Sequence, residues 1–330
     1  MSEWLGGIDI GGTKCAVSLA LREGSNLSIV EKRISPTPDS PQQALEMFAT
    51  MLDELLLKHR PTRGNIPLSA IGISCGGPLD AERGLILSPP NLPGWDHIDV
   101  ITPFKTRYHV PVAVENDANA CALAEWTWGA GIGTKHMIFL TFGTGMGAGF
   151  ILNGRLYSGA NGMAGEVGHI RMEDNGPIGY GKVGSFEGFC SGGGIARLAA
   201  TKALEAIQLG RPPSFCPHVT DIAQITAQKV AEAANREDPL ALEIFRKVGQ
   251  VLGRGLSVLV DVLNPELIVI GSIYLRQQSL LEPIVLAELD KEALGISMNV
   301  CRIVPAGLGE QIGDYASFAI AMEALERGNN

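Results

Sequence analysis

Two glycine-rich turns, each placed directly after an apolar run, constrain the fold of this 330-residue chain more than any other feature. The first turn reads Gly7-Ile8-Asp9-Ile10-Gly11-Gly12-Thr13-Lys14, and the second reads Phe139-Leu140-Thr141-Phe142-Gly143-Thr144-Gly145-Met146-Gly147. Glycine adopts backbone angles that other residues avoid, and it lets an anion approach bare backbone N–H groups. Two such turns at matching places in two halves predict a duplicated fold that holds a polyphosphate from both sides.

The apolar pattern around these turns predicts an α/β fold with mixed sheets and covering helices. In the first half we expect a helix with Ser40 as its N-cap and Pro41 at its first position, and strands flanking it. The expected helix is Pro41–Lys58, and the expected strands are Leu5–Ile10, Lys14–Leu21, Leu27–Ser35, Ala70–Ser74 and Val112–Glu115.

The second half repeats the pattern and then becomes mostly helical. Asn153-Gly154 is a strong hairpin signal, and Asn264-Pro265 ends a long helical pattern. The expected helices are Asp117–Trp128, Ser191–Leu209, Asp221–Ala234, one from Pro239 to Asn264, and Asp314–Arg327; the expected strands are His136–Phe142, Gly147–Leu152, Arg155–Tyr157, Leu267–Ile270 and Cys301–Val304.

Composition excludes several classes of protein. A net charge of −9 argues against nucleic acid as the main partner, because binding a phosphate backbone requires a basic surface. The six scattered cysteines do not form a disulfide framework, and neither a signal peptide nor a membrane-spanning run is evident. We therefore expect a cytoplasmic protein with reduced thiols and no membrane partner.

Two common phosphate-binding motifs fit the glycine turns poorly. The segment Gly176–Val183 comes within one residue of a P-loop, but Val183 cannot coordinate magnesium. The segment Gly143–Ala148 matches a loose GxGxxA dinucleotide pattern, yet that motif must open a helix, and here it opens a hairpin. For each glycine-rich segment taken alone, an ordinary β-turn remains the alternative interpretation.

Acidic and amide residues gather where a strand ends and a helix begins, at Glu115, Asn116 and Asp117. Asn116 or Asp117 could simply cap the helix. A carboxylate at the carboxyl end of a strand is also well placed to take a proton from a substrate hydroxyl. For Glu115 the alternative interpretation is a solvated or a structural acid.

Glu166 and His169 stand three residues apart in a long glycine-rich stretch, and Glu187 follows. A lone histidine is more often structural than catalytic. A carboxylate and an imidazole could, however, jointly bind vicinal hydroxyls, since the carboxylate accepts two hydroxyl protons and the imidazole adds one bond.

Together these elements resemble the ROK family of sugar kinases and related proteins, within the actin, Hsp70 and hexokinase superfamily. The motifs that carry the resemblance span nearly the whole chain: Asp9–Lys14, Gly76-Gly77-Pro78, Glu115-Asn116-Asp117-Ala118, Gly143–Gly147, Ala164–His169, Glu187 and Asn264-Pro265-Glu266. The resemblance implies two ribonuclease-H-like (actin-like ATPase) lobes with ATP and a sugar in the cleft between them.

The family's functional residues carry over position by position. Asp117 would be the general base that takes a proton from the sugar's primary hydroxyl, and Asp9 would help to place Mg²⁺. Residues implied on the sugar side are Gly77, Asn91, Asn116, Glu166, His169 and Glu187. Residues implied on the nucleotide side are Gly11, Gly12, Thr13, Lys14, Gly143, Thr144, Gly145, Gly271 and Ser272.

One departure from the family pattern concerns zinc. Many relatives carry a structural zinc bound by a histidine and three cysteines, but the three cysteine positions here hold Ile178, Tyr180 and Ser185. Because isoleucine and serine supply no thiolate, we predict that the chain has no structural zinc. Another partner must then orient His169.

The resemblance implies an ATP-dependent kinase for glucose or a close hexose, since Ser88–Trp95 is similar to a glucokinase stretch. N-acetylmannosamine, N-acetylglucosamine, another hexose or a β-glucoside are alternative substrates. A transcriptional regulator or a non-catalytic sugar sensor is the alternative class. The regulator is disfavoured because the first strand begins at about Leu5, which leaves no room for a helix-turn-helix segment before it, and the sensor because Asp117 and the phosphate glycines are intact. We expect lobes of residues 1–116, with the C-terminal helix at about 305–330, and 117–304; homodimers are common among relatives.

Overall fold

The computed structural model describes residues 2–60 and 67–328, and its framework is a pair of five-stranded mixed sheets with the same topology. The first sheet has the strand order β3-β2-β1-β4-β8. Its first three strands are antiparallel, whereas β4 and β8 run parallel to β1. The strands are β1 (Ser2–Ile10), β2 (Lys14–Glu23), β3 (Asn26–Pro36), β4 (Leu68–Cys75) and β8 (Val112–Asn116).

The second sheet repeats this arrangement in the order β11-β10-β9-β14-β15, with three antiparallel strands followed by two parallel ones. Its strands are β9 (Met137–Leu140), β10 (Ala148–Leu152), β11 (Arg155–Tyr157), β14 (Leu267–Ile270) and β15 (Arg302–Pro305). The central strands β9 and β14 are wholly buried, as expected for parallel strands covered on both faces. The predicted duplication is therefore confirmed.

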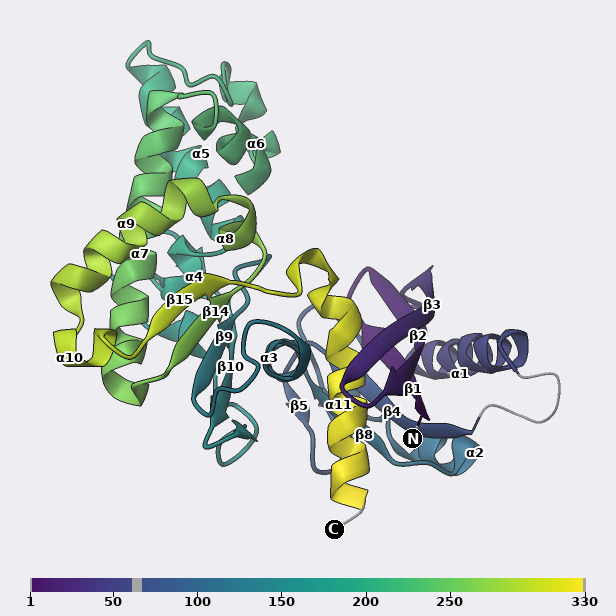
Figure 1. The fold of residues 1–330 in the computed structure, drawn as a ribbon. Helices are drawn as coiled ribbons and strands as arrows, with labels where there is room; N and C mark the ends of the chain where they lie inside the picture. Colours follow the sequence, from purple (N-terminus) through teal and green to yellow (C-terminus); the bar gives the residue numbers. More distant parts are fainter. Residues whose placement is uncertain (1, 61–66, 329–330) are drawn as a thin grey trace.

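Two helices, α3 (Asp117–Trp128) and α11 (Ile312–Gly328), pack against each other in the centre of the molecule (Figure 1). α11 covers β1, β4 and β8, and α3 covers β9 and β10. A side chain at Gly72 would overlap the backbone of α11, and one at Gly149 would meet the backbone of α3. These strand glycines therefore let each helix approach its sheet closely.

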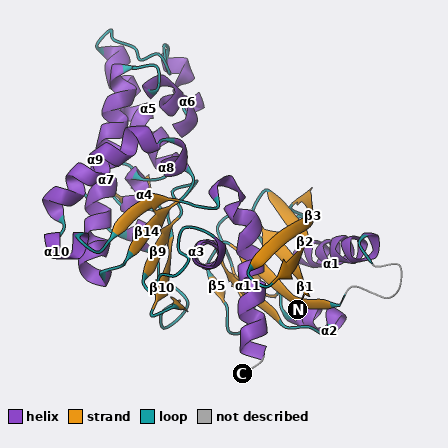
Figure 2. Cartoon of the chain, viewed as in Figure 1, coloured by secondary structure: helices purple, strands orange, loops and turns teal. Residues whose placement is uncertain are grey.

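The remaining helices lie on the outer sides of the sheets, and those at the upper left of Figure 2 form a mostly helical region. α1 (Pro41–Lys58) packs on β2, and the long α7 (Pro239–Leu263) packs on α9 (Gln278–Glu292). The others are α2 (Thr102–Tyr108), α4 (Phe186–Phe189), α5 (Gly192–Gln208), α6 (Ala227–Ala234), α8 (Ile273–Arg276) and α10 (Gly295–Met298), with 3₁₀ turns at Val167–His169, Val219–Gln224 and Gly309–Gln311.

Two small antiparallel elements border the centre of the fold. One is a three-stranded sheet of β5 (Leu79–Asp80), β6 (Leu85–Leu87) and β7 (Asp96–Asp99). The other is a hairpin of β12 (Ile178–Gly179) and β13 (Lys182–Val183). It lies in the long glycine-rich stretch that also contains Glu166 and His169. Within residues 2–60 and 67–328, no helix is both long and apolar enough to cross a membrane.

Most predicted elements are confirmed to within a few residues, and three expectations are wrong. The helix expected over Asp221–Ala234 is broken, because Thr226 caps a separate α6 by accepting a hydrogen bond from the backbone N–H of Lys229 at 3.2 Å. Ser40 occupies the N-cap position of α1, but its hydroxyl donates to Gln42 Oε1 instead of capping the helix. The strand expected over His136–Phe142 is only Met137–Leu140.

Candidate active site

A cleft of about 620 Å³, called here the main cleft, is lined by residues from both halves of the chain. Its lining includes, from the first half, the segment after β4, Asn91 and the end of β8. From the second half it includes the β9–β10 turn and part of the glycine-rich stretch. The predicted site residues that line it are Gly77, Asn91, Asn116, Asp117, Gly143, Thr144, Gly145, Glu166 and Glu187.

Asp117 is the first residue of α3, and it is exposed to the main cleft. Its Oδ1 accepts a hydrogen bond from the backbone N–H of Ala118 at 2.8 Å. Removal from bulk water raises the pKa of Asp117 above its ordinary value, and that hydrogen bond opposes the rise. The second oxygen, Oδ2, has no hydrogen bond among those found in the described residues, so it can receive a proton.

The two residues before Asp117 have structural roles. Asn116 caps α3, since its Oδ1 accepts a hydrogen bond from the Ala118 N–H at 2.9 Å. The buried Glu115 carboxylate accepts hydrogen bonds from the Asn116 N–H and from Asn119 Nδ2, both at 2.9 Å. Capping and catalysis are therefore compatible here, because Asn116 caps the helix and leaves Asp117 facing the cleft.

The second glycine turn is closed by hydrogen bonds between its own residues. The N–H of Gly147 donates to Thr141 Oγ1 at 2.9 Å, and the N–H of Gly143 donates to the Gly145 carbonyl at 3.1 Å. Glu187 reaches the same turn, because its Oε2 accepts from the Met146 N–H at 3.1 Å. A Cβ at Gly145 would lie 2.9 Å from that oxygen, so glycine leaves room for the Glu187 carboxylate beside the turn.

A side pocket of about 200 Å³ adjoins the main cleft and contains His169 together with Glu166 and Glu187. The pKa of Glu166 is raised, mainly by burial, while His169 opposes the rise. The structure thus brings the three residues of the predicted hydroxyl-binding group together. Apolar side chains complete the wall: Pro78, Met146, Met163 and Tyr180.

The segment that carries zinc cysteines in relatives is held here by other contacts. Ser185 is buried and caps α4, because its hydroxyl accepts from the Gly188 N–H at 3.1 Å and donates to the Gly179 carbonyl at 3.3 Å. The ring of Tyr180 meets His169 edge-on, with 5.6 Å between centroids. Within the described residues no group of three or more His, Cys, Asp or Glu side chains converges as a metal site.

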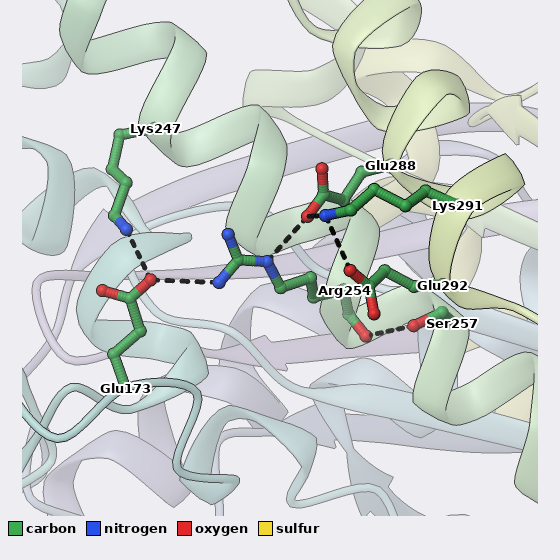
Figure 3. A network of polar contacts seen from close by, with 7 residues as sticks. All are labelled: Glu173, Lys247, Arg254, Ser257, Glu288, Lys291 and Glu292. Atoms are coloured by element: carbon green, nitrogen blue, oxygen red, sulfur yellow. Dashed lines mark hydrogen bonds and ion pairs between the residues drawn. The ribbon is translucent and has the colours of Figure 1, made fainter.

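A network of charged side chains ties this segment to the helices behind it (Figure 3). Glu173 pairs with Lys247 of α7, and its Oε1 accepts from Arg254 Nη1 at 3.1 Å. Arg254 also donates to Glu288 of α9 at 2.7 Å. The N–H groups of Met172 and Glu173 donate to the Gly184 carbonyl at 2.8 and 3.1 Å, which closes the loop around the β12–β13 hairpin.

A second cavity of about 670 Å³, called here the helical cavity, shares Gly143 and Thr144 with the main cleft. Gly192, at the N-terminus of α5, donates its N–H to the Gly143 carbonyl at 2.8 Å and so positions that helix end beside the turn. Ser272 lines this cavity, whereas Gly271 does not. The side chains that complete it were not identified from the sequence: Ala227, Gln228, Ala231, Glu232, Ile273, Arg276 and Gln277.

The first glycine turn lies beside the main cleft without lining it. Gly12 abuts Asn91, whose carbonyl leaves no room for a side chain at Gly12, while Gly12, Thr13 and Lys14 are exposed. Gly11 accepts a hydrogen bond from the Thr37 hydroxyl at 2.6 Å. These predicted nucleotide-side residues therefore do not reach the wall of the main cleft in this structure.

Asp9 lies on β1 opposite Ala16 of β2 and Ser74 of β4. Burial raises the pKa of Asp9 to about 6; the neighbouring Asp117 charge adds to the rise, and Lys32 opposes it. The two carboxylates therefore share one electrostatic environment, which a cation would stabilise.

Comparison with known proteins agrees with this geometry. The model of the ROK family matches residues 5–324. A glucokinase from Halalkalibacterium halodurans is 35% identical over 286 residues, which cover 85% of this chain and 84% of the relative. A ROK family glucokinase from Streptomyces griseus, solved in complex with glucose and AMPPNP, is 27% identical with a TM-score of 0.75, covering 97% of this chain and 99% of that structure.

A xylose repressor from Caldicellulosiruptor bescii is also similar, with 30% identity over 231 residues. The match covers 69% of this chain and 56% of the repressor. Both enzymes and regulators are therefore among the relatives of this chain.

Proposed function

The chain belongs to the ROK family, and from this premise we propose that it is an ATP-dependent sugar kinase that phosphorylates the primary hydroxyl of a hexose. The observation that carries the proposal is the main cleft itself. It contains a carboxylate with a raised pKa, Asp117, together with two further carboxylates, Glu166 and Glu187. The glycine turn lines it as well, and the N–H groups of Thr144 and Gly145 have no hydrogen bond among those found in the described residues.

In the proposed reaction the hexose binds with its primary hydroxyl against Asp117. Oδ2 of Asp117 takes the hydroxyl proton as the oxygen forms a bond to the γ-phosphorus, and the bond from phosphorus to the β-phosphate oxygen of ATP breaks to give ADP. The Ala118 N–H keeps the other carboxylate oxygen in place, so Oδ2 stays directed at the cleft. The raised pKa of Asp117 makes it a better proton acceptor than an aspartate in bulk water.

The sugar ring would be held in the side pocket by Glu166, His169 and Glu187, which lie together there. Glu187 also binds the Met146 N–H, so the sugar site and the phosphate turn are linked by one side chain. Asn91 and Asn116 add amide groups to the lining of the main cleft. Glucose is the proposed substrate because glucokinases are among the similar proteins.

The triphosphate would extend from Gly143–Gly145 toward the N-terminus of α5, and the base would enter the helical cavity. Backbone N–H groups at a helix start favour phosphate. Gly11–Lys14 would reach the phosphates only when the two halves close, because these residues lie outside the cleft wall in this structure. We propose that the closing lobes are residues 1–116 with α11, which packs on β1, β4 and β8, and residues 117–304.

Residues near Asp117 also fit Mg²⁺. Magnesium is held in proteins by one or two carboxylates together with substrate phosphates, and the carboxylates of Asp9 and Asp117 are close enough for the charge of Asp117 to raise the pKa of Asp9. When bound with ATP, the ion neutralises charge that develops on the phosphate oxygens. Asp9 would hold it directly or through water, and Lys14 and Lys32 moderate the local charge.

The proposal is tested with purified protein, ATP, Mg²⁺ and a sugar panel, measuring ADP by a coupled assay. The panel contains glucose, mannose, fructose, allose, N-acetylmannosamine, N-acetylglucosamine, a β-glucoside and 6-deoxyglucose. We expect turnover of glucose or a close hexose and none of 6-deoxyglucose, which lacks the primary hydroxyl. ADP formation that is independent of every sugar would contradict the proposal.

The similarity to xylose repressors supports a second candidate, a sugar sensor that binds without turnover. Calorimetry distinguishes the two: a sensor binds a sugar of the panel with no ADP formed in the presence of ATP and Mg²⁺. The retained Asp117 and glycine turn in one cleft favour the kinase.

A further inference from the structure

We propose that Tyr180, which occupies one of the positions where relatives have a zinc cysteine, contacts the sugar with its ring and limits which sugars the pocket admits. The inference rests on the proposed sugar-binding site and concerns a residue that the sequence indicated only as a lost metal ligand. The position, the exposure and the backbone conformation of Tyr180 support the inference.

Tyr180 lines both the main cleft and the side pocket, together with Glu166 and Glu187. Its side chain is 68% exposed, so the ring is not part of the protein core. Met163, which is 41% exposed, lines both cavities as well. Two accessible apolar side chains beside carboxylates match the usual composition of a ligand pocket, in which apolar walls surround a few polar groups.

This composition fits a pyranose. The ring of a hexose has hydroxyl groups at its edge and C–H bonds on its faces. Carboxylates and His169 can bind the edge, while an aromatic ring can pack on a face with little loss of conformational entropy. The edge-on contact of Tyr180 with His169, at 5.6 Å between centroids, places the aromatic ring directly beside a hydroxyl-binding group.

The backbone at Tyr180 gives an independent argument. Tyr180 and Gly181 form the two-residue turn between β12 and β13, with φ of 43° and 75°. Positive φ at both positions is typical of a type I′ turn, which favours Asn-Gly. A bulky residue at positive φ costs about 1 kcal/mol or more, and such strain is concentrated at functional sites. Tyrosine is thus a poor choice for the turn and a suitable one for a ligand surface.

The hairpin that presents Tyr180 is fixed at its base. Lys182 Nζ donates to the His169 carbonyl at 2.6 Å, and Arg171 Nη1 donates to the Val183 carbonyl at 2.7 Å. Ser185 binds the Gly179 carbonyl, as described above. These contacts hold the backbone that carries Tyr180 beside the side pocket, and removal of the ring would enlarge a pocket of about 200 Å³.

The test measures the affinity for glucose, or for the panel sugar that binds most tightly, by calorimetry without nucleotide. The variants are Tyr180→Ala, Tyr180→Asn and Tyr180→Phe, with Tyr157→Ala as the matched control, since Tyr157 is 51% exposed and lies on β11. We expect Kd to rise about tenfold for the alanine and asparagine variants, to change less than about threefold for phenylalanine, and to stay unchanged for the control.

Thermal unfolding of Tyr180→Asn separates binding from folding. Because asparagine suits the turn, we expect this variant to be at least as stable as the wild type while binding sugar more weakly. The selectivity for glucose over N-acetylglucosamine should also fall in Tyr180→Ala, because the pocket is larger.

An unchanged Kd in Tyr180→Ala would overturn the inference. So would the absence of any further loss when Tyr180→Ala is added to His169→Ala, because Tyr180 would then act only through His169. Failure of the proposed function is a different result: wild-type protein that binds the sugar but forms no ADP. The binding comparison decides the role of Tyr180 in that case too.

Discussion

Replacing Asp9 by asparagine should make the protein more stable while it removes kinase activity. Asp9 has a folded-state pKa of about 6 against an ordinary value of 3.8, chiefly because it is buried. Its ionised form is therefore less favourable in the folded protein than in the unfolded chain. Asparagine has similar shape and carries no charge, so it relieves this cost and also removes the proposed ligand for Mg²⁺.

The magnitude follows from the two pKa values. A carboxyl whose pKa rises on folding binds its proton more tightly in the folded state, so its cost grows as pH rises from 3.8 and levels off above about 6. The cost is close to zero below pH 3.8, about 1.6 kcal/mol at pH 5 and about 3 kcal/mol at pH 8. These are upper values for Asp9→Asn, because an asparagine amide at this position also has a desolvation cost; the attraction of Asp9 to Lys32 and Lys14 is already included in its pKa.

Urea unfolding of wild type and Asp9→Asn at pH 5 and pH 8 measures the effect. We expect the variant to gain free energy of unfolding at both values and to gain roughly twice as much at pH 8. Asp39→Asn, at an exposed position, is the matched control and should change little. A variant no more stable than wild type at pH 8, or a gain that does not depend on pH, would refute the reasoning.

Three further outcomes are expected around the segment that lacks zinc cysteines. Ser185→Ala should lower the free energy of unfolding by about 1 kcal/mol in urea, because α4 loses its cap; Ser185→Thr should retain most of it, and an unaffected alanine variant would contradict the capping role. Glu173→Gln should speed amide hydrogen exchange in residues 170–184, since it weakens the network with Lys247 and Arg254 (Figure 3); Glu292→Gln is the control, and equal exchange in both would count against the network. Metal analysis should find far less than one zinc per chain and EDTA should leave Tm unchanged, whereas about one zinc per chain, lost together with folding on chelation, would disprove the absence of the site.

Helices and strands were predictable from the sequence wherever apolar residues recur with one period and form a single buried face. Pro41–Lys58 was predicted to the residue because Phe48, Leu52 and Leu55 form one buried stripe. The duplicated topology could also be foreseen, since the same order of strands and glycine turns recurs. The break at Thr226 could not, because a capping threonine within a polar stretch resembles any other exposed residue.

The candidate site was predictable at the residues that belong to a motif, such as Asp117 and Glu187. It was not predictable where several loops converge. Tyr180 lies in the turn of the β12–β13 hairpin and Met163 in a separate loop, and the fold brings both to the same pocket. Likewise, no local pattern shows that Gly12 abuts Asn91 and lies outside the cleft wall.

The most direct test of the central claim compares wild type with Asp117→Asn. Sugar affinity by calorimetry and turnover by ADP formation are measured on the same preparations. If Asp117 takes the hydroxyl proton, asparagine should leave Kd for the sugar within a few-fold and lower kcat by about 10² to 10⁴. Wild-type kcat should also fall at acid pH, because protonated Asp117 cannot accept a proton. An Asp117→Asn enzyme with near wild-type kcat would contradict the account.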